Sequence, residues 1–322
     1  MTTREQQFDV AIWGAGIAGS LLALSLSTAG FRVAVIPKGP ATKPLRPGFS
    51  IVDGTMTPTD DMERTLLKRA EANGAFLFGD DTVDSLEPPI GPVRAVITSS
   101  GRITVRALIL ADGSDPRVGR ERGLLPEWEP WQLVHFAYGS LISSGQTAPA
   151  FDVIAGARAE YPWRGYRIGN IIGVGWYLQH EMESRVHVTE LLDDVRERFV
   201  GACFDQRDPL VEVVPYEPRH LEAGIVVDNV IAIGDLVGIV NPLSLRRSEL
   251  SLKMAERVSR VVGDWLRGGS PGTRDLKRMR SVLKPLVGTE QPTESGPPML
   301  LVPRPPERGR GFGPLIRRLV ER

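Results

Sequence analysis

Uninterrupted apolar runs and helical patterns alternate at the start of the chain. Phe8–Trp13 (FDVAIW) is apolar at almost every position, which is typical of a strand buried on both faces. A glycine-rich turn, GAGIAG, follows, and then the Leu- and Ala-rich stretch Ser20–Gly30 predicts a helix that ends at a C-cap glycine. Phe31–Pro37 (FRVAVIP) predicts a second buried strand. This order of strand, turn, helix and strand predicts a βαβ unit.

Shorter elements follow this unit. Residues 60–75 (DDMERTLLKRAEANGA) have acids in the first turn and apolar residues on one face, so they predict a helix. Three apolar runs, at 82–86, 92–98 and 102–113, predict short strands. The stretch 39–61 contains several Pro and Gly with little periodicity, and we expect a loop or an excursion of the chain there.

The second half of the chain predicts a further sheet and two more helices. Strand-like runs at 131–143 and 165–178 indicate the sheet. Residues 188–204 have the pattern of an amphipathic helix. The run 226–235 (VVDNVIAIGD) predicts another buried strand, and Leu245–Leu266 predicts a long helix packed against the first domain.

Together these elements predict a doubly wound, Rossmann-like α/β domain with an inserted, mainly antiparallel β-sheet domain. The expected boundaries are 1–60, 61–125 and 221–268 for the discontinuous first domain, 126–220 for the inserted domain, and 269–322 for a Pro/Gly/Arg-rich tail that ends in a short basic helix.

Composition narrows the class of protein. Lys and Arg number 39, as do Asp and Glu, so nucleic acid is not an expected partner. The single cysteine, Cys203, excludes an intramolecular disulfide and a cysteine-built metal site. The N-terminus lacks the features of a secretory signal, and no run approaches the ~18 apolar residues of a membrane span. We expect a soluble, cytoplasmic protein with no metal and no transmembrane segment.

The GAGIAG turn indicates a dinucleotide-binding site. Gly14 permits the tight turn, Gly16 lets a pyrophosphate approach the backbone, and Gly19 allows close packing of helix and strand. A phosphate then meets the free N–H groups and the positive end of the helix. Where such folds carry Asp or Glu for the ribose hydroxyls, this chain has Pro37 and Lys38, and lysine accepts no hydrogen bond.

Three motifs in order carry a resemblance to a known family. After GAGIAG come Ala111-Asp112-Gly113 at the end of an apolar strand, with Arg117 and Arg120 downstream, and then the segment IAIGD, which contains Gly234 and Asp235. The segment GIVNPLS, which contains Pro242, follows. Over residues 8–266 the chain resembles the FAD-dependent monooxygenase and geranylgeranyl-reductase superfamily, which includes aromatic hydroxylases and flavin halogenases.

The resemblance implies roles for particular residues. Gly14, Gly16, Gly19, Asp112, Gly113, Gly234, Asp235 and Pro242 would contact FAD, with Asp235 on a ribityl hydroxyl. The segment YPWRGYRIGNIIGVGWYL is similar to a substrate-domain segment of the reductases. There Tyr161, Trp163 and Trp176 are either the lining of an apolar substrate cavity or ordinary aromatic residues of a sheet core.

The chain departs from the family after its Asn-Pro-Leu-Ser segment. Where the family has glycines that face the flavin, this chain has Arg246 and Arg247 in the first turn of a predicted helix, where the helix dipole disfavours cations. The two arginines would stabilise anionic reduced flavin, bind an acidic group of the substrate, or fill a flavin site that has lost its function. They are the only candidates for a catalytic role, because the four histidines show no triad or metal spacing.

Two functions from different classes are therefore expected. The first is an FAD-dependent oxidoreductase that acts on a mainly apolar small molecule in secondary metabolism. It would be a monooxygenase or a double-bond reductase, with NAD(P)H as electron donor. The second is a descendant of the flavoprotein fold without redox flavin, acting as a cyclase, an isomerase or a binding protein with the substrate in the vacated cavity.

Overall fold

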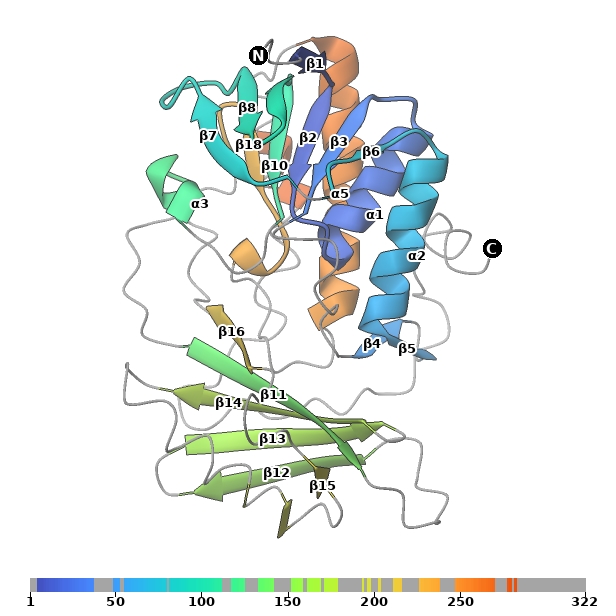
Figure 1. Ribbon diagram of the computed structural model, residues 1–322, viewed down its shortest axis with the longest axis vertical. Coiled ribbons are helices and arrows are strands. Elements are labelled where there is room, and N and C mark those ends of the chain that lie inside the picture. The colour runs from blue at the N-terminus through green and yellow to red at the C-terminus, as the bar shows by residue number, and fades with distance from the viewer. Residues whose placement is uncertain are drawn as a thin grey trace. The chain divides into compact units, whose positions relative to one another are not determined.

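The fold is described from a computed structural model of the chain (Figure 1). The structure describes residues 5–37, 49–52, 55–79, 81–111, 117–124, 133–141, 152–158, 161–168, 171–178, 193, 196–197, 202–203, 211–215, 226–237, 247–269, 277–279 and 281–282. The chain divides into two compact units, the first formed by residues 1–128, 217–293 and 298–322 and the second by residues 129–216 and 294–297.

A six-stranded sheet is the centre of the first unit. Its strand order is β17-β18-β10-β2-β3-β6, and all neighbours are parallel except β17 and β18. The strands are β2 (Val10–Trp13), β3 (Val33–Ile36), β6 (Phe76–Leu77), β10 (Ala107–Leu110), β17 (Val226–Val227) and β18 (Val230–Ala232). The chain builds outward from β2 to β3 and β6 on one side and later adds β10 and β18 on the other. The topological switch point therefore lies between β2 and β10.

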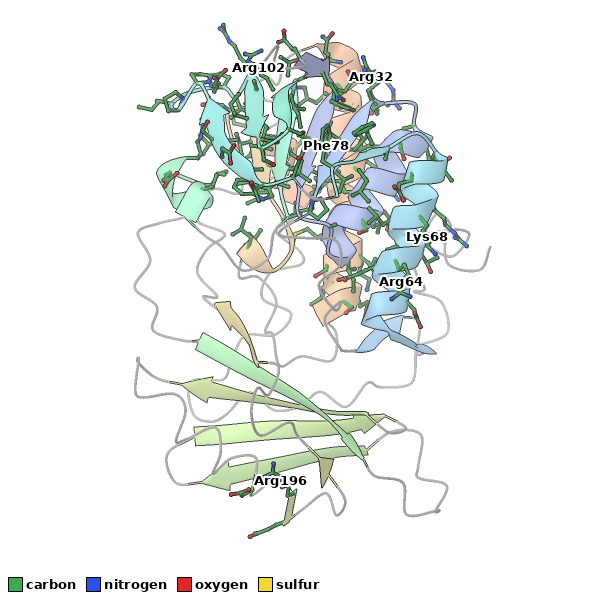
Figure 2. All side chains as sticks on the ribbon, in the orientation of Figure 1. Arg32, Arg64, Lys68, Phe78, Arg102 and Arg196 are labelled. Atoms are coloured by element: carbon green, nitrogen blue, oxygen red, sulfur yellow. The ribbon has the colours of Figure 1, made fainter. Side chains whose placement is uncertain are left out.

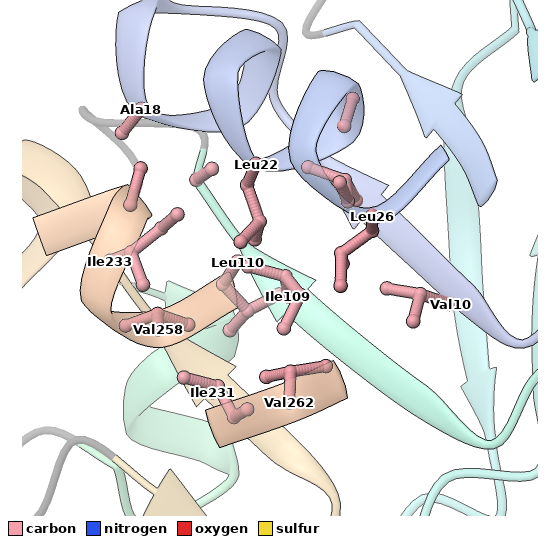
Figure 3. Packing of buried hydrophobic residues seen from close by; sticks show 14 of the residues in the cluster. Val10, Ala18, Leu22, Leu26, Ile109, Leu110, Ile231, Ile233, Val258 and Val262 are labelled. Carbon is pink, nitrogen blue, oxygen red and sulfur yellow. The ribbon is translucent and has the colours of Figure 1, made fainter. Parts of the chain in front are cut away.

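Helix α1 (Ile17–Thr28) is buried along almost its whole length and packs against both α2 (Thr59–Ala72) and α5 (Arg247–Gly268). Figure 3 shows how Leu22 of α1, Ile109 of β10 and Val258 of α5 meet in one apolar cluster. This enclosure explains why the sequence of α1 is apolar nearly all round, as expected for a helix without a solvent face.

The amphipathic helix predicted at 60–75 is confirmed as α2. Leu66 and Ala70 are buried, whereas Arg64 and Lys68 are exposed on its outer side (Figure 2). The preceding stretch, expected to be a loop, contains a two-stranded hairpin of β4 (Phe49–Val52) and β5 (Thr55–Pro58).

A β-meander, rather than a helix, connects β6 to β10. It consists of β7 (Val83–Glu87), β8 (Ala95–Thr98) and β9 (Gly101–Thr104), and β1 (Glu5–Gln7) adds to β9 in parallel. The predicted single strand at 102–113 is therefore wrong, because β9 and β10 belong to different sheets.

Arg106 lies at the point where the chain passes from one sheet to the other. Its guanidinium donates to Asp9 Oδ1 at 2.9 Å and to the carbonyl of Gly269 at 3.1 Å, beyond the end of α5. These contacts connect the sheet to the C-terminal end of α5, where a cation complements the helix dipole.

The predicted strand at 226–235 is also interrupted. It forms a hairpin of β17 and β18, with a turn at Asp228 (φ 52°) and Asn229. The buried Asn229 side chain accepts from the Val93 N–H at 2.7 Å and donates to the carbonyls of Val93 at 2.6 Å and Arg106 at 3.0 Å. This one amide therefore joins the hairpin, the meander and β10.

The second unit is an antiparallel sheet with the order β12-β13-β14-β11-β15, and β16 also pairs with β11. Its strands are β11 (Leu133–Leu141), β12 (Asp152–Arg158), β13 (Tyr161–Ile168), β14 (Ile171–Leu178), β15 (Ala202–Cys203) and β16 (Val211–Pro215). The predicted fold class, a Rossmann-like domain with a second, antiparallel sheet, is thus confirmed. The helix predicted at 188–204 is wrong at its end, because Ala202–Cys203 forms β15.

Part of the predicted tail packs on the first unit. Met279 is buried in the apolar core, Arg278 forms an ion pair with Asp264 of α5 at 2.7 Å, and Arg257 donates to the carbonyl of Val282 at 2.7 Å. The helix predicted at the end of the tail lies outside the described residues.

Asn229→Ala is expected to lower the free energy of unfolding by about 2–3 kcal/mol, since it leaves the buried Val93 N–H and two carbonyls without their partner. Urea denaturation measures this change. Asn73→Ala removes an exposed amide that donates to the carbonyl of Arg69, and it should change stability by no more than about 0.5 kcal/mol. Equal effects of the two substitutions would contradict the joining role of Asn229.

Candidate functional site

The GAGIAG turn leads from β2 into α1 at the switch point of the sheet. Gly14 has φ 115°, a conformation that favours glycine, and its N–H donates to the carbonyl of Ile36 at 2.8 Å. Gly16 is the N-cap of α1 with extended backbone, and no side-chain hydrogen bond caps the helix from that position. The first turn of α1 therefore begins where the carboxyl ends of the parallel strands meet.

Gly19 is required by the packing of α1. A Cβ atom at this position would lie 2.1 Å from the Gly14 carbonyl oxygen and 3.3 Å from the Cβ of Ala111. The first distance is far below any van der Waals contact, so only glycine lets α1 approach the turn and the end of β10 this closely. The role predicted for Gly19 in helix–strand packing agrees with this geometry.

Gly234 brings the third motif to the same place. It has φ 70°, and a Cβ atom there would lie 3.4 Å from the Cβ of Ala18. Its N–H donates to the sulfur of Met254 in α5 at 3.2 Å. The turn that contains Asp235, η2 (Gly234–Val237), therefore lies between the first turn of α1 and the middle of α5.

The three motifs thus converge on the first turn of α1. Ala111 adjoins Gly19, Gly234 adjoins Ala18, and hydrogen bonds join the strand ends, from Ala111 N–H to the Trp13 carbonyl at 2.7 Å and from Ile233 N–H to the Leu110 carbonyl at 2.9 Å. The segments that the sequence resemblance relates to one ligand lie together although more than a hundred residues separate the outermost motifs.

A fourth element reaches this turn, and the sequence pattern gave no indication of it. Glu63 of α2 is buried, and its Oε1 accepts a hydrogen bond from the Ile17 N–H at 3.0 Å. Its only sequence signal is a carboxylate among several near the start of an amphipathic helix, where acids are usual.

Several predicted site residues lie outside the described residues or are described only in their backbone. Asp112, Gly113, Pro242 and Arg246 lie outside them. For Asp235 in η2 and for Arg247, the first residue of α5, the backbone position alone is described. Their roles at a flavin stay predictions.

The aromatic residues of the second unit lie close in register. Trp163 of β13 is directly opposite Trp176 of β14, and Tyr161 is two residues from Trp163 on the same strand. Because side chains alternate between the faces of a sheet, these three positions share one face. The backbone thus brings together the residues predicted to line a substrate cavity, and that role stays a prediction.

Arg122, the residue directly after α3 (Arg117–Glu121), is fixed to the connection between β7 and β8 of the meander. Its guanidinium donates to the carbonyls of Pro88 at 2.8 Å and Gly91 at 3.1 Å. Burial lowers the pKa of Arg122 from its usual value, although Glu121 and Asp228 oppose this shift. The guanidinium of arginine stays charged at neutral pH in proteins, so we interpret these contacts of Arg122 as structural.

The part of the chain that the structure describes contains neither a metal-site cluster nor a membrane-spanning helix. No group of three or more His, Cys, Asp or Glu side chains there is arranged to hold a metal ion. No helix among these residues is long and apolar enough to cross a membrane.

Comparisons with known proteins relate the chain to flavoproteins at the level of the fold. No protein-family profile matches the chain. A curated relative, the probable electron transfer flavoprotein-quinone oxidoreductase YdiS of Escherichia coli, is 21% identical over 332 aligned positions, which cover 80% of this chain and 77% of the relative.

Solved structures with the same fold include a geranylgeranyl bacteriochlorophyll reductase-like protein from Thermoplasma acidophilum. It is 13% identical with a TM-score of 0.68, and the match covers 88% of this chain and 84% of that protein. PqsL from Pseudomonas aeruginosa, a probable FAD-dependent monooxygenase, is 15% identical with a TM-score of 0.59, and the match covers 87% and 93%. The chain therefore has the fold of FAD-dependent monooxygenases and geranylgeranyl-type reductases, and the resemblance inferred from its motifs is confirmed.

Gly19→Ala and Gly16→Ala are expected to differ sharply in stability. Gly19→Ala should lower the free energy of unfolding by about 3 kcal/mol or more, because the new Cβ overlaps backbone. A Cβ at Gly16 would lie 3.6 Å from Glu63 Oε1, an ordinary contact, so Gly16→Ala should cost no more than about 1 kcal/mol. Thermal denaturation of both variants measures the difference, and a well-folded, stable Gly19→Ala protein would show that α1 does not pack as described.

Proposed function

We propose that this protein is an FAD-dependent oxidoreductase that acts on a mainly apolar small molecule. The observation that supports it best is the convergence of three motifs on the first turn of α1, at the switch point between β2 and β10. Open α/β sheets bind their ligands in this crevice, outside the carboxyl ends of the strands.

The shape of the turn fits a dinucleotide. Gly16 offers no Cβ to a pyrophosphate, and Gly19 and Gly234 let three backbone segments lie close together around the end of α1. The backbone N–H groups and the positive end of α1 would face the phosphates. Gly14, Gly16 and Gly19 would thus hold the pyrophosphate, and Asp112, Gly113, Gly234, Asp235 and Pro242 would contact the rest of FAD by resemblance.

Bound FAD would supply hydride transfer to a double bond or O₂-dependent hydroxylation, while the protein orients the substrate and sets the local electrostatics. These two possibilities are supported by the names of two structural neighbours, a geranylgeranyl bacteriochlorophyll reductase-like protein and a probable FAD-dependent monooxygenase. NAD(P)H would serve as electron donor.

The second unit would bind the substrate. Tyr161, Trp163 and Trp176 occupy positions on one face of the sheet, and in this proposal their side chains line an apolar substrate cavity. Arg246 and Arg247 would bind either the reduced flavin or an acidic group of the substrate. Because α5 begins at Arg247, the helix dipole disfavours a cation there, and a nearby anion would offset that cost. A role in secondary metabolism is part of the same proposal.

One observation favours the second candidate function, a flavoprotein fold without redox flavin. Glu63 makes its hydrogen bond at the turn that a pyrophosphate would approach. A protein that keeps this contact permanently would hold no dinucleotide, and it would act as a cyclase, an isomerase or a binding protein.

The purified protein is expected to be yellow, with absorption near ~450 nm and one FAD released per chain on denaturation. Asp235→Ala should weaken FAD binding, measured by equilibrium dialysis of the apoprotein, because it removes the predicted acceptor for a ribityl hydroxyl. Asp228→Ala removes an exposed carboxylate from the β17–β18 turn and serves as the control. Colourless protein that takes up no added FAD would refute the proposed function.

The chemistry is resolved by O₂ dependence. With a substrate in hand, NAD(P)H consumption by a monooxygenase should stop under anaerobic conditions, whereas consumption by a double-bond reductase should continue at the same rate. Stopped-flow absorbance under argon and in air makes this comparison. NAD(P)H that reduces the flavin under neither condition would contradict the proposed donor.

A further inference from the structure

The end of α1 receives its polar partner from another helix. Gly16 has no side chain to cap α1, and the first turn of α1 contains no acidic residue. Glu63, 46 residues from Ile17 in the chain, accepts the Ile17 N–H at 3.0 Å. The N-terminal N–H groups of a helix have no partner within the helix, so Glu63 supplies an acceptor that α1 itself lacks.

The position of Glu63 is the one that the second glycine of the motif leaves open. A Cβ atom built on Gly16 would lie 3.6 Å from Glu63 Oε1. In a dinucleotide-binding turn this glycine is required because a pyrophosphate approaches the backbone along that direction. Here a carboxylate oxygen lies next to the space that this glycine leaves open.

Glu63 is also largely buried, so its charge is poorly screened by water. Its side chain is only 8% exposed, while Arg64 and Lys68 of the same helix face outward (Figure 2). A carboxylate and a pyrophosphate compete for the same positive helix end, and two anions in one enclosed place repel each other. Their simultaneous presence is therefore unfavourable.

We propose that Glu63 is a built-in competitor of the cofactor: its carboxylate occupies the pyrophosphate position at α1, and the dinucleotide binds when this side chain leaves the Ile17 N–H. This inference rests on the proposed function, since it takes FAD as the ligand of the turn. It makes Glu63 the residue that sets the affinity for the cofactor, with the empty protein stabilised by the same N–H groups that the phosphate needs.

Glu63→Gln is the sharpest test, because glutamine keeps the size and a carbonyl oxygen for the Ile17 N–H but removes the negative charge. FAD affinity of the apoprotein is measured by quenching of flavin fluorescence. We expect Glu63→Gln to bind FAD about tenfold more tightly than the wild type, or more, since a like charge next to the phosphate is removed. Glu71→Gln, at an exposed position of the same helix, should leave the affinity unchanged.

A second variant tests whether the result depends on the folding of Glu63→Gln, and a second ligand tests whether it depends on the flavin ring. Glu63→Ala should show the same gain in FAD affinity, with a lower melting temperature of the ligand-free protein because α1 loses its partner. Inorganic pyrophosphate should raise the melting temperature of Glu63→Gln more than that of the wild type.

The outcomes separate the inference from the proposed function. FAD binding by the wild type with equal or weaker binding by both Glu63 variants overturns the inference and leaves the function standing. Tight binding by the variants with none by the wild type supports the inference and refutes a flavin function of the natural protein. If no variant binds FAD, both fail, because Glu63 is then not what excludes the cofactor.

Discussion

The close approach between the first turn of α1 and the sheet is the contact on which the rest of the site depends. Gly19 lies where any side chain would meet the carbonyl of Gly14 and the Cβ of Ala111. Because Gly19 has no side chain, the helix end reaches the carboxyl ends of β2 and β10. Ala18 then lies close enough to Gly234 that a Cβ atom on Gly234 would be 3.4 Å from the Cβ of Ala18. One packing constraint thus holds all three motifs together.

The same constraint creates an electrostatic requirement. The N-terminus of α1 has no capping side chain and no acid in its first turn, so its first N–H groups have no partner within the helix and carry a partial positive charge. Glu63 answers this requirement from α2, and a phosphate would answer it equally well. Stability of the empty fold and affinity for an anionic cofactor are therefore linked through one position.

The sequence patterns predicted where helices and strands lie more reliably than which strands pair with one another. The βαβ unit, α2 and α5 agree with prediction, because apolar periodicity records which residues are buried. The runs 102–113 and 226–235 each predict one strand, but the structure divides both of them. Apolar character does not record where the chain changes sheets, and the division is made by Arg106 and Asn229 through contacts with distant segments.

The sequence by itself determined the glycine turn, the apolar strands around it and the order of the three motifs, because each is a local pattern of a few residues. Only the tertiary structure decided that Ala111, Gly234 and Glu63 meet at one helix end. Glu63 is one of several acids near the start of an amphipathic helix, where most carboxylates face water. Its function depends on which face of α2 packs on α1, and that is set by the whole core rather than by any neighbouring residue.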